Sequence, residues 1–309
     1  MARFLLSRLL QAIVSFLVVA LVVFVLMRIS GNAVEMLLGE QGATAEMRDH
    51  LIQKFGLDKS YPEQFLRFIA AVAVGDFGNS LISGLPVRQL IGQALINSII
   101  LSVAAMALAL AIAIPAGVYS AIYPNSLFDR SVRTFAVFGQ SAPSFVTAIM
   151  LIVIFSVWLR WLPTSGIGGF RHMILPSATL AWYIAAGIIR MTRTSMLEVM
   201  RADYITLARA KGVRWIVVIW KHAFKNAALP VTTFCAILFI GLIGGSVVVD
   251  VVFSWPGLGL LLVDSIVYRD FPVVQTIVLL ISAMFLVINL VVDVVYAYLN
   301  PRISLHAVS

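Results

Sequence analysis

The run Leu9–Met27, LLQAIVSFLVVALVVFVLM, decides the class of fold, because it holds 19 consecutive uncharged residues. A helix needs about 20 apolar residues to cross the hydrocarbon of a bilayer, where it satisfies its own backbone hydrogen bonds. The run is longer than the apolar core of a signal peptide, and a poor cleavage site follows it. We therefore predict a retained membrane-spanning helix.

The composition of the whole chain agrees with this prediction. Hydrophobic residues make up 61% of the 309 residues, charged residues make up 12%, and the mean hydropathy is +1.01. Soluble domains hold about 25% charged residues. The net charge of +8 does not indicate nucleic-acid binding, since the basic residues lie in loops between apolar runs. Cys235 is the only cysteine, so neither a disulfide framework nor a cysteine metal site is possible within the chain.

Five further runs are also long enough to span a bilayer and carry no charge. These runs are Gln89–Phe128, Thr134–Leu159, His172–Ile189, Asn226–Val249 and Phe271–Val292. We therefore predict an all-α integral membrane protein with six transmembrane helices. With a cytoplasmic N-terminus, thirteen lysines and arginines fall in inner segments, and only Arg160, Arg171 and Arg269 fall in short outer loops. The positive-inside rule then places both termini in the cytoplasm.

The segment Ser30–Arg88 is too long for a simple turn. Two stretches in it, Thr44–Phe55 and Tyr61–Ala73, have helical spacing, and Pro62 stands in the first turn of the second. We expect a small extracytoplasmic helical cap; a flexible loop is the alternative. The chain then has three parts: a transmembrane helix at 1–29, the cap at 30–88 and a five-helix core at 89–309.

The loop 190–230 joins the fourth and fifth predicted spans on the inner side. On a helix from Ala202, the residues Ile205, Ala208 and Gly212 share one face. Gly212 is predicted to end this helix in the left-handed conformation, before a second helix near Val213–Phe224. A small apolar face can dock into a groove of a partner protein. From physics alone, contact of the basic residues with anionic lipid is an equal alternative.

Small and polar residues interrupt two of the predicted spans. In the fifth span Gly241 and Gly245 are four residues apart, which favours close helix packing. In the third, Gln140, Ser141 and Pro143 predict a kink near a cavity. These five residues are candidates for helix packing or for a transport pathway, and both interpretations stay open.

The stretch VFSWPGLG at Val252–Gly259 predicts a turn where the chain leaves the fifth span. Phe253 and Trp255 are expected at the outer interface of the membrane, as in aromatic belts. An anchoring turn without substrate contact is favoured over a substrate gate.

The loop also resembles a known sequence pattern. DYITLARAKG at Asp203–Gly212, followed by His222, Asn226 and the pair Leu229–Pro230, is similar to the EAA loop of binding-protein-dependent ABC importer permeases. The form is that of the dipeptide and oligopeptide branch. Two positions depart from the general pattern: Thr206 replaces a glutamate and Ala227 replaces an isoleucine. Asp203 is a candidate for the role of the missing glutamate.

The resemblance runs nearly end to end, although Gly31, Asn32 and Ala33 stand where the family has Gly-Asp-Pro. Matching stretches are KFGLDKSYPEQF, GDFGNS, LPTSG, ILP, VFSWPGLG, RDFPVVQ and YAYLNPRI. It implies a type I ABC importer permease in a bacterial inner membrane, in which the loop docks on an ATPase subunit. The implied docking residues are Asp203, Ile205, Ala208, Ala210, Lys211 and Gly212.

The resemblance also implies partners and a substrate class. The partners are a homologous second permease, two ATP-binding subunits that hold ATP and magnesium, and a solute-binding protein. No cofactor is expected in this chain. It lacks a GxxxxGK[ST] phosphate loop, so ATP hydrolysis is expected in the separate subunits and this chain is not expected to be an enzyme. Peptides are the expected solutes, with nickel chelates or glutathione as alternatives.

Two other classes of protein explain the sequence less well. A stand-alone channel or secondary carrier is expected to show inverted repeats. It also leaves the loop at Gly212 without a role. An intramembrane enzyme is disfavoured, because the four histidines are scattered and the chain has neither HExxH nor GxSxG.

Overall fold

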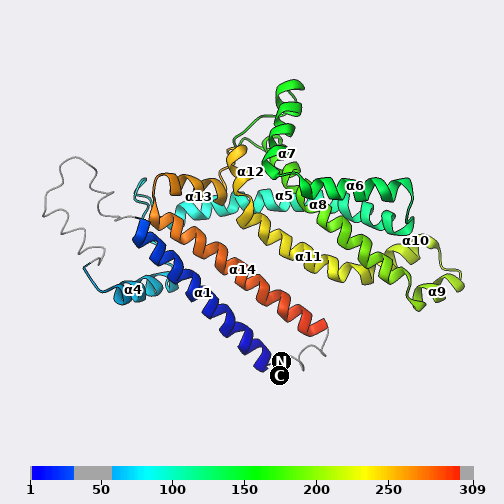
Figure 1. The fold of residues 1–309 in the computed structure, drawn as a ribbon, viewed down its shortest axis with the longest axis horizontal. Helices are drawn as coiled ribbons and strands as arrows, with labels where there is room; N and C mark the ends of the chain where they lie inside the picture. The colour runs from blue at the N-terminus through cyan, green and yellow to red at the C-terminus, as the bar shows by residue number, and fades with distance from the viewer. Residues whose placement is uncertain (1, 31–57, 300–309) are drawn as a thin grey trace. The chain divides into compact units, whose positions relative to one another are not determined.

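The computed structural model describes residues 2–30 and 58–299. The helix expected at Thr44–Phe55 lies outside these residues. The described residues form two compact units: unit 1 contains 2–30, 58–94 and 261–299, and unit 2 contains 95–260. Figure 1 shows helices throughout both. Outside helices, the described residues contain one isolated antiparallel bridge, between Asn79 and Pro86.

The long helices follow the apolar runs and are joined by shorter ones. Unit 1 contains α1 (Ala2–Ser30), α4 (Tyr61–Ala73), α14 (Phe271–Leu299), the start of α5 (Val87–Ile122) and the end of α13 (Leu258–Val267). Unit 2 contains the rest of α5, α6 (Leu127–Ser141), α7 (Ser144–Leu151), the π-helix η1 (Ile152–Trp158), α8 (Phe170–Met200), α9 (Asp203–Ala210), α10 (Trp215–Val217), the π-helix η2 (Val218–Ala223), α11 (Phe224–Gly245) and α12 (Val247–Val252).

Within the described residues, five helices are long and apolar enough to span a membrane, and a bent pair makes a sixth span if it crosses as one unit. The pair consists of Leu127–Ser141 and Ser144–Trp158, whose axes differ in direction by 105°. The break falls at Ala142 and Pro143, where the sequence predicts a kink. Ala142 is extended, with ψ 124°, because a residue before proline is disfavoured in the helical region.

The second expected span, Gln89–Phe128, is too long at its C-terminal end. The helix stops at Ile122, and a short turn leads to α6. Asn125 adopts φ 65° in this turn, and the hydroxyl of Ser126 accepts a hydrogen bond from the backbone N–H of Asp129, which caps the new helix. Since no charged residue lies between Arg88 and Asp129, charge spacing alone could not reveal the turn.

The fifth expected span, Asn226–Val249, differs at both ends. Its helix begins at Trp215 and passes through η2 into α11, so the second loop helix and the span form one continuous rod. Arg214 precedes this rod, which therefore starts two residues after the expected Val213. At the other end Ser246 separates α11 from α12.

Unit 1 is built on the apolar helices α1 and α14, which pack side by side (Figure 1). The helix expected at Tyr61–Ala73 is confirmed as α4, with proline in its first turn. It packs on the end of α1 through aromatic rings: the centroid of Phe24 lies 5.5 Å from that of Phe65 and 5.9 Å from that of Phe68. Arg28 donates a 2.6 Å hydrogen bond to Gln64 at the same contact.

Unit 2 is organised around α8, which packs against α6, α7 and α11. Two glycines allow close approach to it. A Cβ on Gly117 of α5 would lie 2.7 Å from the Cβ of Thr192, and one on Gly139 of α6 would lie 3.2 Å from the Cβ of Ala186. The buried apolar side chains of α5, α7, α8, α11 and α12 form the core. The central helix α8 is accordingly the most enclosed of the long helices, and 67% of its most apolar window is buried.

Candidate functional site: the α9 segment and the cavity at the α6–α7 bend

The α9 segment, residues 201–214, follows α8 and ends in a closed turn. Gly212 has φ 75°, which confirms the predicted left-handed conformation. Its N–H donates to the carbonyl of Arg209 at 2.9 Å, and the N–H of Val213 donates to the carbonyl of Ala208 at 3.2 Å. This pair of hydrogen bonds is the Schellman motif, which satisfies the last carbonyls of a helix. The turn is thus fixed by backbone geometry.

The inner face of α9 packs on its own chain. Ile205 is 1% exposed and belongs to a cluster with Met196 of α8 and Val218 of η2, and Ala208 is partly buried against the same cluster. The apolar face predicted from helical spacing is therefore real, but Ile205 holds the segment in place and offers no surface to a partner. Sequence spacing identifies a buried face without saying which molecule covers it.

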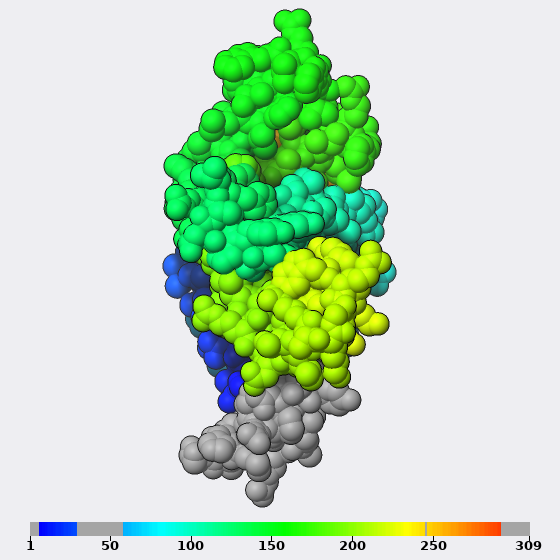
Figure 2. All heavy atoms as spheres, turned by 90° about the vertical axis from the view of Figure 1, so that its right-hand side faces the viewer, coloured from blue at the N-terminus to red at the C-terminus, as the bar shows by residue number. Residues whose placement is uncertain are grey.

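The outer face of α9 is open and mixed in character. Leu207 is 55% exposed and Tyr204 is 43% exposed. Four of the predicted docking residues are also exposed: Asp203, Ala210, Lys211 and Gly212. The yellow-green atoms of this segment form an open surface in Figure 2. This surface, rather than the Ile205 face, is what a partner can reach.

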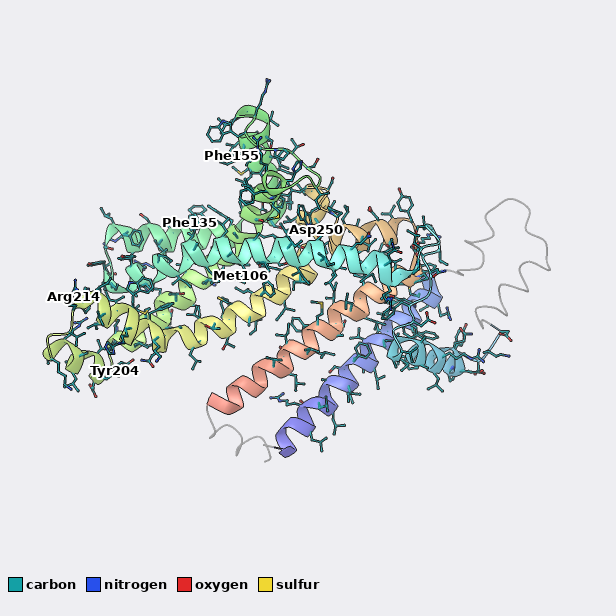
Figure 3. The ribbon with its side chains drawn as sticks, turned by 180° about the vertical axis from the view of Figure 1, so that it is seen from behind. Met106, Phe135, Phe155, Tyr204, Arg214 and Asp250 are labelled. Atoms are coloured by element: carbon teal, nitrogen blue, oxygen red, sulfur yellow. The ribbon has the colours of Figure 1, made fainter. Side chains whose placement is uncertain are left out.

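Two side-chain contacts tie α9 to the helix that follows. The amide of Asn226 on α11 donates a 3.1 Å hydrogen bond to the hydroxyl of Tyr204, and the guanidinium of Arg209 lies 4.1 Å from the ring centroid of Trp215. Tyr204 and Arg214 mark this end of unit 2 in Figure 3. Together with Ile205, these contacts join α9 to both α8 and the rod that contains α11.

A cavity of about 440 Å³ lies at the α6–α7 bend. We call it the bend cavity. It is lined by Gln140, Ser141, Ala142, Pro143, Ser144, Thr179, Leu180, Tyr183, Ile184, Leu238, Gly241, Leu242, Val248 and Val249. Four of the five predicted packing or pathway residues meet here, from α6, the bend and α11: Gln140, Ser141, Pro143 and Gly241. The fifth, Gly245, ends α11.

The lining of the bend cavity is mostly apolar and carries a few uncharged polar groups. Its polar side chains are an amide and several hydroxyl groups, and none of the lining residues is acidic or basic. A Cβ on Gly241 would meet no atom within 4 Å, so this glycine leaves open space. Such a wall can contact polar solutes through hydrogen bonds without holding an ion tightly.

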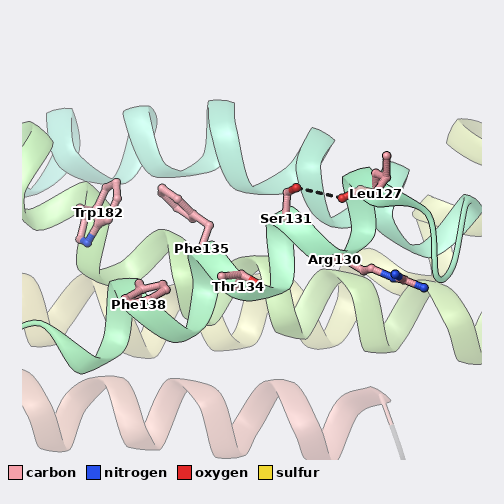
Figure 4. A pocket seen from close by; sticks show the side chains of 7 residues that line it. All are labelled: Leu127, Arg130, Ser131, Thr134, Phe135, Phe138 and Trp182. Carbon is pink, nitrogen blue, oxygen red and sulfur yellow. Dashed lines mark hydrogen bonds between the residues drawn. The ribbon is translucent and has the colours of Figure 1, made fainter.

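A second hollow, of about 680 Å³, runs along α6 and is shown in Figure 4. We call it the α6 groove. Its lining residues are Leu127, Arg130, Ser131, Thr134, Phe135, Phe138 and Trp182. Phe135 and Trp182 meet edge to face, with ring centroids 4.2 Å apart, and fix α6 on α8. The α6 groove is separate from the bend cavity, because the two share no lining residue.

Sequence reasoning missed Asp129, which is fully buried and bonded by several donors. Its carboxylate accepts two hydrogen bonds from Arg193, at 2.8 and 3.1 Å, one from the hydroxyl of Ser120 and one from the backbone N–H of Asn125 at 2.9 Å. Residues from α5, α6 and α8 thus meet at one carboxylate. The local pattern Ser126-x-x-Asp129 signals a helix start. Nothing local signals Arg193, 64 residues away.

The turn at Val252–Gly259 is an anchor built from backbone hydrogen bonds. The carboxylate of Asp250 accepts from the N–H of Gly259 at 3.0 Å, and the hydroxyl of Ser98 accepts from the N–H of Leu258 at 2.8 Å. A Cβ on Gly257 would lie 2.7 Å from Asp250 Oδ2, so this position requires glycine. The anchoring interpretation fits this network.

The expected position of two aromatic residues in that turn is wrong. Phe253 is 1% exposed and Trp255 is 2% exposed, so neither forms an interfacial belt. The indole N–H of Trp255 donates to the carbonyl of Asn97 at 3.1 Å, which satisfies its polar group inside unit 2. Because the indole finds a protein partner, it does not need the membrane–water interface.

Family models match both ends of the chain. Residues 113–305 match the model described as binding-protein-dependent transport system inner membrane component, and residues 1–84 match the model of the N-terminal part of such components. The first match alone covers more than half of the chain.

Curated relatives match over almost the full length. The glutathione transport system permease protein GsiC of Pectobacterium atrosepticum is 43% identical over 98% of this chain and 99% of its own. The protein of the same name from Salmonella paratyphi A is 42% identical, and that from Escherichia coli K12 is 41% identical, over the same shares of both chains.

A solved structure has the same fold. A chain of the MetNI methionine ABC transporter, in an inward-facing conformation, matches with a TM-score of 0.57 and 19% identity, over 70% of this chain and 98% of that chain. At this identity the likeness concerns the fold alone. It confirms the predicted type I importer permease fold.

Proposed function

We propose how this chain works from one premise: it belongs to the family of binding-protein-dependent transport system inner membrane components and is the permease subunit of an ABC importer. Its solutes are short peptides, with glutathione as the first candidate. The relatives at 41–43% identity are named as glutathione transport permeases, and glutathione is itself a tripeptide.

The proposed complex contains two permease subunits, two ATP-binding subunits and a solute-binding protein. This chain supplies half of the pathway, and separate subunits bind ATP and magnesium and hydrolyse ATP. Both termini face the cytoplasm. The chain divides into the first transmembrane helix (1–29), an extracytoplasmic cap (30–88) and the core (89–309). The mostly apolar lining of the bend cavity, with a few hydroxyl and amide groups and no charge, supports a passage for solutes that are held weakly during transit.

The α9 segment is the proposed docking site for an ATP-binding subunit. One observation supports this assignment. The α9 helix ends in a Schellman turn, Ile205 packs its inner face on the rest of the chain, and its outer face is exposed. The docking residues are Asp203, Ala210, Lys211 and Gly212, to which we add the exposed Leu207, with Ile205 and Ala208 as support. A rigid segment with an open face transmits displacement, whereas a flexible loop absorbs it.

A substitution at Leu207 tests docking and transport together. We expect Leu207→Glu to leave the chain in the membrane, because the side chain is 55% exposed, but to abolish co-purification of the ATP-binding subunit and ATP-driven uptake of labelled glutathione. The measurement uses proteoliposomes that contain the complete importer and its solute-binding protein.

The matched control is Leu127→Glu, an exposed leucine outside the α9 segment. It should retain the ATP-binding subunit. If Leu207→Glu retained both the subunit and uptake, the docking assignment would be wrong, and contact of α9 with lipid would be favoured. If the unaltered importer moved a dipeptide but no glutathione, the docking assignment would stand and the first-choice solute would be replaced.

A further inference from the structure

The helix α8 connects the two candidate sites within unit 2. Its residues Thr179–Ile184 contribute to the lining of the bend cavity, and Met196 packs against Ile205 of α9. Between Ile184 and Met196 the helix rises about 18 Å without a proline. A displacement of α9 therefore reaches one wall of the bend cavity along a single continuous helix.

The end of α6 lines another part of the bend cavity through Gln140 and Ser141. For the cavity to change shape in a defined way, α6 must move together with α8. Asp129 and Arg193 join the two helices near the α9 end. The side chain of Asp129 is 0% exposed and that of Arg193 is 20% exposed, so water competes little for their two hydrogen bonds. Farther along, Gly139 allows α6 to lie close to Ala186 of α8.

We propose that the Asp129–Arg193 ion pair is a positioning device that makes α6 move with α8, so that displacement of α9 is transmitted to the parts of the bend cavity that α6 and α8 line. This inference rests on the proposed function of α9 as the docking segment. Removal of one partner leaves a buried charge without its main partner, which loosens α6 at this end. The pair does not touch the solute, and its role is in coupling.

The chain provides a matched pair of arginines for the test. Arg133 Nε also faces Asp129, at 3.4 Å, but its side chain is 49% exposed and lies on α6 itself, so it cannot join two helices. We expect Arg193→Gln to lower the amount of glutathione imported per ATP hydrolysed about tenfold, within the usual range of coupling between sites, and Arg133→Gln to leave this ratio within about twofold. Asp129→Asn should behave like Arg193→Gln.

A distance measurement reads the same effect without transport. Spin labels at Leu127→Cys on α6 and Thr194→Cys on α8, in a Cys235→Ala background, should show one narrow distance distribution in the otherwise unaltered importer and with Arg133→Gln. The distribution should broaden with Arg193→Gln. If Arg193→Gln fails to enter the membrane, Arg193→Lys carries the test, and its ratio of import to hydrolysis should fall below that of the unaltered importer.

Two results would overturn the proposal. In the first, Arg193→Gln changes neither the amount of glutathione imported per ATP hydrolysed nor the distance distribution. In the second, uptake and ATP hydrolysis fall in the same proportion, which indicates a purely structural role. Failure of the proposed function itself has a different signature. In that case the unaltered importer shows no ATP-driven uptake, while the distance measurement still reports whether the ion pair holds α6 on α8.

Discussion

At the scale of single residues, Gly212 has the most sharply defined role. Its φ of 75° lies in the left-handed region, and a Cβ there would meet no atom within 4 Å, so only backbone strain opposes a substitution. We expect Gly212→Val to cost about 1–2 kcal/mol in the turn and to open the Schellman motif. ATP-driven uptake should fall, while membrane abundance, measured by immunoblot, should stay unchanged.

The control for this prediction is Gly212→Asn, because asparagine tolerates the left-handed conformation better than other non-glycine residues. It should retain most of the uptake. Equal activity of the valine and asparagine variants would contradict this prediction, because it would show that the backbone conformation of residue 212 does not matter for coupling.

The sequence predicts local features of single residues, whereas their tertiary contacts cannot be read from it. Helical spacing finds the face that contains Ile205 and Ala208, and the conformation of Gly212 follows from its position after a helix. Whether Ile205 contacts a partner or its own chain depends on tertiary packing. The Asp129–Arg193 pair is invisible for the same reason, since its partners are 64 positions apart.

At the scale of elements, the bend between α6 and α7 is the feature most closely tied to the cavity. Pro143 keeps Ala142 out of the helical region and has no N–H to continue the helix. We expect Pro143→Ala to let α6 and α7 straighten in part and to reduce uptake. The change in angle can be measured as a longer distance between spin labels at Val137→Cys and Met150→Cys, in the Cys235→Ala background.

Pro115 provides the control, because it lies inside α5 and the helix continues past it. Pro115→Ala should leave uptake and the label distance almost unchanged. The bend would be set by packing rather than by proline if Pro143→Ala behaved in the same way as Pro115→Ala.

Element boundaries depend on features that hydropathy does not contain. The apolar runs locate the long helices because hydrocarbon demands uncharged, internally bonded backbone. The end of α5 at Ile122 instead depends on the left-handed Asn125 and the Ser126 cap, both in an uncharged turn. Likewise, the rod from Trp215 to α11 crosses two lysines, Lys221 and Lys225, so a span defined by uncharged residues alone begins too late, at Asn226.

At the scale of the whole molecule, the number of spans depends on whether the bent pair α6–α7 crosses the membrane or returns to the side from which it entered. An even number of spans puts both termini on the same side, as the distribution of basic residues predicts. A pair that returns leaves five spans, and the two termini then lie on opposite sides. The direction of the bent pair therefore decides the topology of the chain.

Cysteine labelling distinguishes the two directions. In a Cys235→Ala background, Leu127→Cys lies before the bend and Ile167→Cys lies after it, and both native side chains are exposed, at 82% and 57%. If the pair crosses the membrane, a membrane-impermeant maleimide added to intact cells with a permeable outer envelope should label position 167 and leave position 127 unlabelled. Position 127 should react once the membrane is opened by detergent.

Leu207→Cys on α9 completes the experiment, since α8 separates it from position 167. In the six-span arrangement it reacts like position 127, because both face the cytoplasm. Equal labelling of positions 127 and 167 from one side means that α6 and α7 re-enter, and the five-span chain then cannot place both termini in the cytoplasm. In that outcome the bend cavity would lie at the tip of a returning loop at Pro143 rather than in the middle of a span, and re-entrant loops of this kind are tolerated where they line a water-filled cavity.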